Sequence, residues 1–118
     1  MKTLILGAST NQSRYSNMAA LSLLRRGFKI ELLGKDKGEV SGIPIKQDIA
    51  EIHDIDTVTL YLNPSHQASY QDFILNLKPR RVIFNPGTEN PEFQEKLAKN
   101  NIEPIEACTL VMLSTGEY

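Results

Sequence analysis

The first stretch of the chain that could bind a ligand is the polar segment GASTNQSRYS, residues 7–16, which follows an apolar run. A glycine that ends a first strand and precedes a helix is the usual phosphate-binding turn of α/β proteins. The three-glycine dinucleotide pattern is absent, because Ser9 and Gln12 stand where its second and third glycines would be. A polar loop in which Ser13 or Ser16 caps the next helix is the simpler alternative. We predict a phosphate-binding set of backbone N–H groups, side-chain donors and one guanidinium: Gly7, Ala8, Ser9, Thr10, Asn11, Gln12, Ser13 and Arg14.

A second candidate segment, residues 33–38, follows the next apolar run and contains two lysines. NAD-binding sheets carry a carboxylate at this place, which holds the ribose hydroxyls. Here the segment opens with Gly34 and Lys35, and Lys37 is close by. A lysine favours a ribose that carries an extra phosphate, as in coenzyme A or NADP. A solvated turn, in which Asp36 reduces the local positive charge, is the alternative.

Two Asn-Pro loops complete the predicted binding edge. Asn63 and Pro64 follow the third predicted strand, and Asn85, Pro86 and Gly87 follow the fourth. Gly87 would let the backbone approach a ligand closely. A simple strand-to-helix turn is the alternative for this loop.

Few residues are candidates for catalysis. His53 lies in the connection between the second and third predicted strands, and His66 lies in the first turn of a predicted helix at the edge of the cleft. Neither has a nucleophile in obvious partnership. Cys108 is the single cysteine, so no internal disulfide can form, and we expect it to pack as a small apolar side chain rather than act as a reactive thiol. No Cys/His cluster has zinc spacing. We therefore predict neither a catalytic residue nor a metal site.

Apolar runs rich in β-branched residues alternate with helix-like segments, which is typical of a parallel sheet with crossover helices. We predict an α/β fold with a single Rossmann-like, doubly wound parallel sheet and helices on both faces. Its five strands, in spatial order 3-2-1-4-5, cover residues 3–6, 29–33, 57–62, 81–84 and 103–106. The order reverses between the first and fourth strands, so we expect a ligand at the carboxyl ends of the strands there.

Three helices are predicted from apolar periodicity and from capping residues. The first covers residues 16–26 and is ended by Gly27, which can adopt a left-handed conformation. The second continues from Pro64 to Leu77 and the third from Pro91 to Lys99, each after a capping asparagine. A weaker helical turn is expected over residues 48–53.

Length and composition exclude several classes of protein. With 118 residues, 41% apolar and 23% charged, the chain fits one globular domain over residues 1–118. A net charge of −1 without a basic stripe argues against a nucleic-acid-binding surface. Neither a signal peptide nor a membrane span is evident, so a cytoplasmic location is expected. Self-association into a homo-oligomer stays open.

The order and spacing of these short motifs resemble the small coenzyme A-binding proteins, whose fold is shared with the N-terminal domain of the succinyl-coenzyme A ligase α subunit. The resemblance covers nearly the whole chain. The motifs that carry it are Gly7-Ala8-Ser9 followed by Arg14, RRGF at 25–28, GIPI at 42–45, LNP at 62–64, NPGTEN at 85–90 and the late Cys108.

The resemblance implies roles for several residues. It places Ser9, Thr10, Asn11, Gln12 and Arg14 around the phosphates of coenzyme A, and Lys35, seven positions before Gly42, near the ribose phosphate. Many members of the small family have Val-Asn-Pro at the end of the second strand, where this chain has Leu32-Leu33-Gly34. The phosphorylated histidine of the ligase belongs to a later domain and has no counterpart here.

Three functions are compatible with the sequence. The leading hypothesis is a binding protein for coenzyme A or an acyl-coenzyme A, without evident catalytic machinery. An NADP-dependent oxidoreductase or redox sensor is the first alternative, since Lys35 would also suit NADP. An accessory subunit or scaffold with a degenerate nucleotide site is the second.

Overall fold

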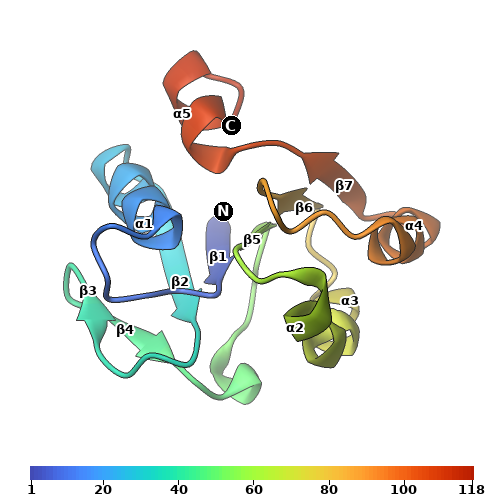
Figure 1. Cartoon of the computed structure of the whole chain (residues 1–118), viewed down its shortest axis with the longest axis horizontal. Helices are drawn as coiled ribbons and strands as arrows, with labels where there is room; N and C mark the ends of the chain where they lie inside the picture. Colours follow the sequence, from blue (N-terminus) through green and yellow to red (C-terminus); the bar gives the residue numbers. More distant parts are fainter.

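Buried leucine, isoleucine and valine side chains form the central strands of the protein. The computed structural model describes all 118 residues and contains one seven-stranded sheet in the order β3-β4-β2-β1-β5-β6-β7 (Figure 1). All neighbouring strands are parallel except β3 and β4, which form an antiparallel pair. The strands are β1 (Lys2–Leu6), β2 (Lys29–Leu33), β3 (Glu39–Val40), β4 (Ile43–Lys46), β5 (Thr57–Leu60), β6 (Arg81–Phe84) and β7 (Glu103–Glu106).

The predicted α/β class and doubly wound, Rossmann-like sheet are confirmed, but the number of strands and their assigned order need correction. The sequence analysis missed β3 and β4. A proline, Pro44, lies within the four residues of β4, and proline weakens any strand signal. Because β4 takes the place beside β2, the strand that begins at Thr57 lies next to β1 instead, with Thr57 opposite Thr3. The order reverses between β1 and β5, not between the first strand and the strand at 81–84.

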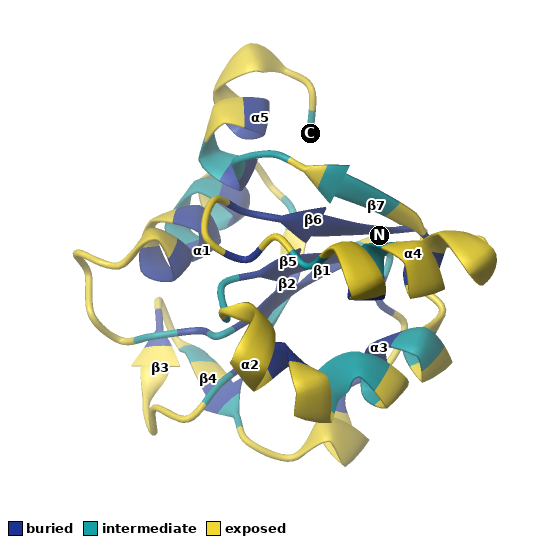
Figure 2. Ribbon diagram, turned by 45° about the vertical axis from the view of Figure 1, so that its right-hand side comes forward, coloured by how far each residue is buried: buried dark blue, intermediate teal, exposed yellow.

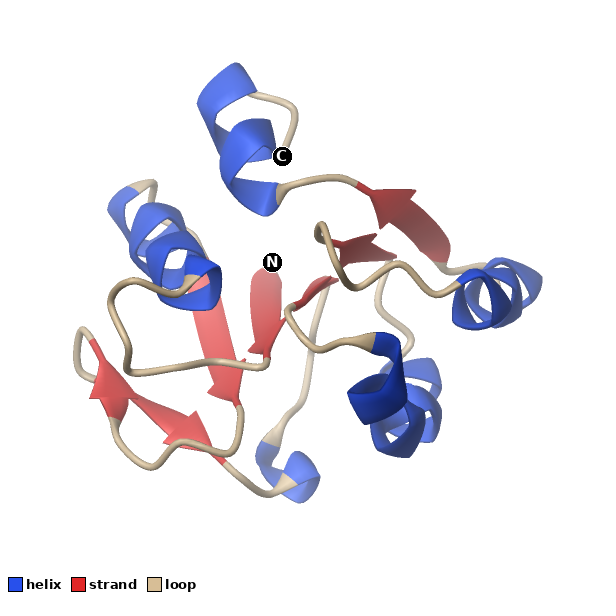
Figure 3. Ribbon diagram, viewed as in Figure 1, coloured by secondary structure: helices blue, strands red, loops and turns tan.

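Helices cover both faces of the sheet (Figure 3). On one face, α1 and α5 pack through Ala20, Leu23 and Leu113 against strand residues such as Ile5. On the other, α3 and α4 pack through Ile74, Phe93 and Leu97. The strands at the centre of the sheet are buried, whereas the outer sides of the helices are exposed (Figure 2). The helical segments are α1 (Tyr15–Arg25), η1 (Ile49–Glu51), α2 (Pro64–Gln67), η2 (Ala68–Tyr70), α3 (Gln71–Leu77), α4 (Pro91–Lys99) and α5 (Thr109–Thr115).

The capping residues were predicted better than the helix interiors. Asn63 and Asn90 cap α2 and α4 with their side chains, each followed by proline, and α4 has the predicted bounds. The predicted helix over residues 64–77 is instead divided into α2, a 3₁₀ turn and α3. The expected turn at 48–53 is the short η1. Helix α5 was not predicted.

Candidate functional site

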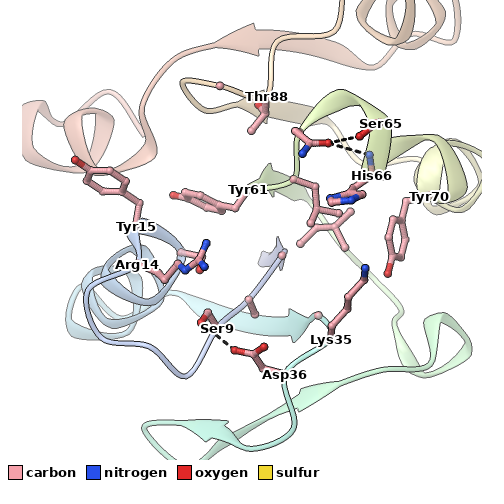
Figure 4. A pocket seen from close by; sticks show the side chains of 18 of the residues that line it. Ser9, Arg14, Tyr15, Lys35, Asp36, Tyr61, Ser65, His66, Tyr70 and Thr88 are labelled. Atoms are coloured by element: carbon pink, nitrogen blue, oxygen red, sulfur yellow. Dashed lines mark hydrogen bonds between the residues drawn. The ribbon is translucent and has the colours of Figure 1, made fainter.

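An open cleft of about 980 Å³ lies at the carboxyl ends of the central strands (Figure 4). Its walls are the loops after β1, β2, β5 and β6, together with one side of α2 and η2. These loops flank the boundary between β1 and β5, where the strand order reverses. Open α/β sheets bind their ligands at this position, so the cleft is the candidate binding site.

Ten of the predicted binding residues line this cleft, drawn from all four loops. They are Gly7, Ala8, Ser9, Asn11, Arg14, Gly34, Lys35, Asn63, Pro86 and Gly87.

The other six predicted residues, Thr10, Gln12, Ser13, Lys37, Pro64 and Asn85, do not line the cleft. Lys37 borders a separate, smaller hollow beside β4. Asn85 is buried and its amide bonds inside the protein: Nδ2 donates to Thr59 Oγ1 (2.7 Å), and Oδ1 accepts from the backbone N–H of Thr109 (2.8 Å). Asn85 therefore ties β5, β6 and α5 together.

The loop after β1 is held by its own side chains and by Asp36 of the loop after β2. Gly7 has φ +95°, a conformation that favours glycine, and its N–H donates to the carbonyl of Leu33 (2.9 Å). Ser9 Oγ donates to Asp36 (2.9 Å), and Ser13 Oγ donates to Asn11 Oδ1 (2.6 Å). The serine hydroxyls that were expected to face phosphate therefore donate to other side chains of the protein.

The N-terminus of α1 supplies the donors that remain. No side chain caps this helix and its first turn has no acidic residue. The backbone N–H groups of Tyr15 and Ser16 donate to no group of the protein, and both residues line the cleft together with Arg14. Free N–H groups, the positive end of the helix dipole and a guanidinium together make an environment that suits a phosphate.

Positive side chains outnumber negative ones in the cleft. Arg14 and Lys35 line it, as does the imidazole of His66, whereas Asp36 is its single carboxylate. His53 does not line it. Figure 4 shows Lys35 extending into the cleft toward the end that His66 and Tyr70 border. An anion entering the cleft would meet a favourable electrostatic field at both ends.

The far wall of the cleft is positioned by a buried amide. Gln67 is fully buried, and its Nε2 donates to the carbonyl oxygens of Leu62 (2.8 Å) and Thr88 (2.7 Å). Its Oε1 accepts from Nδ2 of Asn90 (3.0 Å). One side chain thus joins the loop after β5, the loop after β6 and the start of α4.

Twelve of the lining residues were not among the predicted binding residues. Most come from the end of β5 and the exposed side of α2 and η2, where the capping asparagine predicts a helix start but does not indicate which helix face meets the cleft. Burial raises the pKa of one of them, Tyr61, to about 12, so its hydroxyl stays protonated at neutral pH. The twelve are Leu6, Tyr15, Ser16, Asp36, Tyr61, Leu62, Ser65, His66, Ala68, Ser69, Tyr70 and Thr88.

His, Cys, Asp and Glu side chains nowhere form a group of three or more that could hold a metal ion. No helix has both the length and the apolar character needed to cross a membrane. Cys108 is half-buried at the start of α5 and does not line the cleft.

Comparison with known proteins gives one family and several similar structures. Residues 1–114 match the family model described as a CoA binding domain. The crystal structure of an uncharacterised protein is 52% identical, with a TM-score of 0.97, covering 99% of this chain and 97% of that chain. No curated protein matches this chain.

Two more distant structures show the same fold. A protein from Thermus thermophilus is 20% identical with a TM-score of 0.87, covering 99% of this chain and 90% of that chain. A conserved hypothetical protein from Pyrococcus furiosus is 24% identical with a TM-score of 0.82, covering 93% of this chain and 97% of that chain.

Proposed function

The chain belongs to the CoA-binding domain family, and we propose that it binds coenzyme A or an acyl-coenzyme A in the cleft between the loops after β1, β2, β5 and β6. The observation that carries the proposal is the uncapped start of α1, where Arg14 and two unused backbone N–H groups border the cleft. This end would hold the diphosphate, since helix N-termini and guanidinium groups both favour phosphate oxygens.

Lys35 supports coenzyme A over a nucleotide without a ribose phosphate. Its side chain extends into the cleft from the loop after β2, the position at which α/β sheets bind the ribose (Figure 4). An ammonium group there would attract the 3′-phosphate of coenzyme A. In this proposal the protein binds its ligand and carries out no reaction on it.

A thermal-shift series tests the proposal. Coenzyme A at about 100 times its dissociation constant should stabilise the folded protein by roughly 2.7 kcal/mol and raise the melting temperature. Acetyl-coenzyme A, dephospho-coenzyme A, NADP and NADPH are the comparison ligands. An unchanged melting temperature with millimolar coenzyme A contradicts the proposal, and a shift with NADP alone would favour an NADP-binding protein.

Mass spectrometry of the natively purified protein identifies the ligand that it carries. The proposal expects the mass of coenzyme A or of one of its thioesters in complex with the chain. A different nucleotide found in the complex would replace coenzyme A as the ligand.

A further inference from the structure

Asp36 is a cleft residue to which the family resemblance assigns no role. It follows Lys35 in the loop after β2, and both residues line the cleft. In Figure 4 its carboxylate lies between Ser9 and the base of Lys35. A carboxylate beside an expected phosphate site repels an anion and weakens its binding, unless the carboxylate has a hydrogen-bond or ion-pair partner of its own. Its position therefore requires a physical explanation.

The two carboxylate oxygens of Asp36 are in different situations. Oδ2 accepts hydrogen bonds from Ser9 Oγ (2.9 Å) and from the backbone N–H of Thr10 (3.3 Å). Oδ1 accepts from no donor of the protein, and no lysine or arginine forms an ion pair with Asp36. A carboxylate has about four lone-pair sites, so the loop uses one oxygen and leaves the other able to accept a ligand donor.

Ribose chemistry supplies such a donor. Nucleotide-binding sheets use a carboxylate at the end of their second strand to accept the ribose hydroxyls. A ribose with a phosphate on one of these hydroxyls still has the neighbouring one. Lys35 and Asp36 are consecutive at this position and offer an ammonium group for the phosphate and a carboxylate oxygen for the hydroxyl.

We infer that Asp36 is a specificity-determining residue whose Oδ1 accepts the ribose 2′-hydroxyl of the bound nucleotide, next to the 3′-phosphate at Lys35. This inference rests on the proposed function, because it takes coenzyme A as the ligand. Asp36 then has two roles: Oδ2 fixes the loop after β1, and Oδ1 selects a ribonucleotide over its 2′-deoxy counterpart.

Two ligands and two variants test the inference by titration calorimetry. Coenzyme A is compared with 2′-deoxy-coenzyme A, in which hydrogen replaces the 2′-hydroxyl. A hydrogen bond to a charged acceptor predicts roughly tenfold weaker binding of the deoxy ligand by the wild-type protein. In Asp36→Asn, the amide oxygen can still accept from Ser9 and Thr10. The ratio of the dissociation constants for the deoxy ligand and for coenzyme A should shrink at least about threefold in this variant. Asp72→Asn is the control, since it makes the same carboxylate-to-amide change on α3 at a residue that does not line the cleft, so the ratio should persist.

The outcomes separate this inference from the proposed function. Equal affinities of the wild-type protein for the two ligands overturn the role of Asp36 and leave coenzyme A binding intact, whether or not a variant folds. If Asp36→Asn keeps the wild-type ratio of dissociation constants, the role of Asp36 is also overturned, because another group must then accept the hydrogen bond of the 2′-hydroxyl. Absence of saturable coenzyme A binding overturns the proposed function itself, and the inference with it.

Discussion

The backbone at Gly34 passes so close to Ala8 that a Cβ atom at position 34 would lie 2.6 Å from the Ala8 carbonyl oxygen. The end of β2 and the loop after β1 are therefore in direct backbone contact at the base of the cleft. Gly34 also donates its N–H to the carbonyl of Lys46 in β4 (3.1 Å). The close approach to Ala8 explains why a glycine directly follows β2 in this chain.

Gly34→Ala should damage both stability and binding. The added Cβ forces the loop after β1 to move, and such overpacking costs about 1–3 kcal/mol in free energy of unfolding. Urea denaturation and coenzyme A titration measure the two effects. Gly42→Ala is the control, because its φ of +84° strains an alanine but nothing lies within 4 Å of the new atom. It should lower stability by about 1 kcal/mol and leave coenzyme A affinity unchanged; equal affinity loss in both variants would contradict the role of Gly34.

Arg14→Ala should weaken coenzyme A binding about tenfold, because a charge-assisted hydrogen bond to the diphosphate is lost. Arg14 is exposed, so the melting temperature of the free protein should hardly change. Arg25→Ala, in the last turn of the same helix, is the matched control and should bind normally. If the two variants bind equally well, the start of α1 does not hold the diphosphate.

Lys35→Ala should abolish the preference for coenzyme A over dephospho-coenzyme A. The wild-type protein is expected to prefer coenzyme A roughly tenfold, the effect of one ammonium–phosphate contact. Lys37→Ala carries the same charge change but lies beside the smaller hollow near β4, and it should keep the preference. The ratio of the two dissociation constants is the measurement, and a preference retained in Lys35→Ala would rule out its contact with the ribose phosphate.

Gln67→Leu should destabilise the fold by about 2–4 kcal/mol. Leucine fills the buried position but leaves the carbonyl oxygens of Leu62 and Thr88 without their donor, and each such buried group costs about 1–3 kcal/mol. Gln71→Leu removes a partly exposed contact to Lys96 (3.3 Å) and should change stability by less than about 0.5 kcal/mol. Similar denaturation midpoints for the two variants would show that Gln67 does not hold the cleft wall.

Lowering the pH should reduce the free energy of unfolding by a small amount, because Asp56 becomes protonated. Arg80 donates Nε and Nη2 to this carboxylate (both 3.1 Å), and these bonds hold the pKa of Asp56 below its usual value of 3.8. A lowered pKa in the folded state stabilises the protein fully above pH 3.8, and this contribution is lost as pH falls through the folded-state pKa.

The pair is partly exposed, so its contribution should be on the order of 0.5–1 kcal/mol. Denaturation of the wild type, Asp56→Asn and Arg80→Gln at pH 7 and near pH 3 measures it. Both variants should show a smaller acid-induced loss than the wild type. If Arg80→Gln loses as much stability at acid pH as the wild type, the lowered pKa of Asp56 has another cause.

Local patterns predicted most of the sheet and its edge. The strands at 81–84 and 103–106, and the Asn-Pro starts of α2 and α4, depend on neighbouring residues and were predicted correctly. Strand β4 was missed because its place in the sheet depends on its pairing with β2, a long-range contact, and not on its own four residues. That single omission displaced the strand at Thr57 in the assigned order.

The candidate site was predicted at the level of loops rather than of side chains. Parallel strands bring their carboxyl ends to one edge whatever their order, so the loops after β1, β2, β5 and β6 were identified correctly as its walls. Whether Asn85 faces the cleft or the core depends on α5, which packs Thr109 against it from far along the chain. The side of η2 that presents Tyr70 is likewise set by packing and not by spacing.

Calorimetric titration of the wild-type protein with coenzyme A is the most direct test of the account. It predicts saturable binding with one molecule of coenzyme A per chain, weaker binding of dephospho-coenzyme A, and a large loss of affinity in Arg14→Ala but not in Arg25→Ala. Absence of binding heat at millimolar coenzyme A, together with an unchanged melting temperature, would contradict the assignment of this cleft as a coenzyme A site.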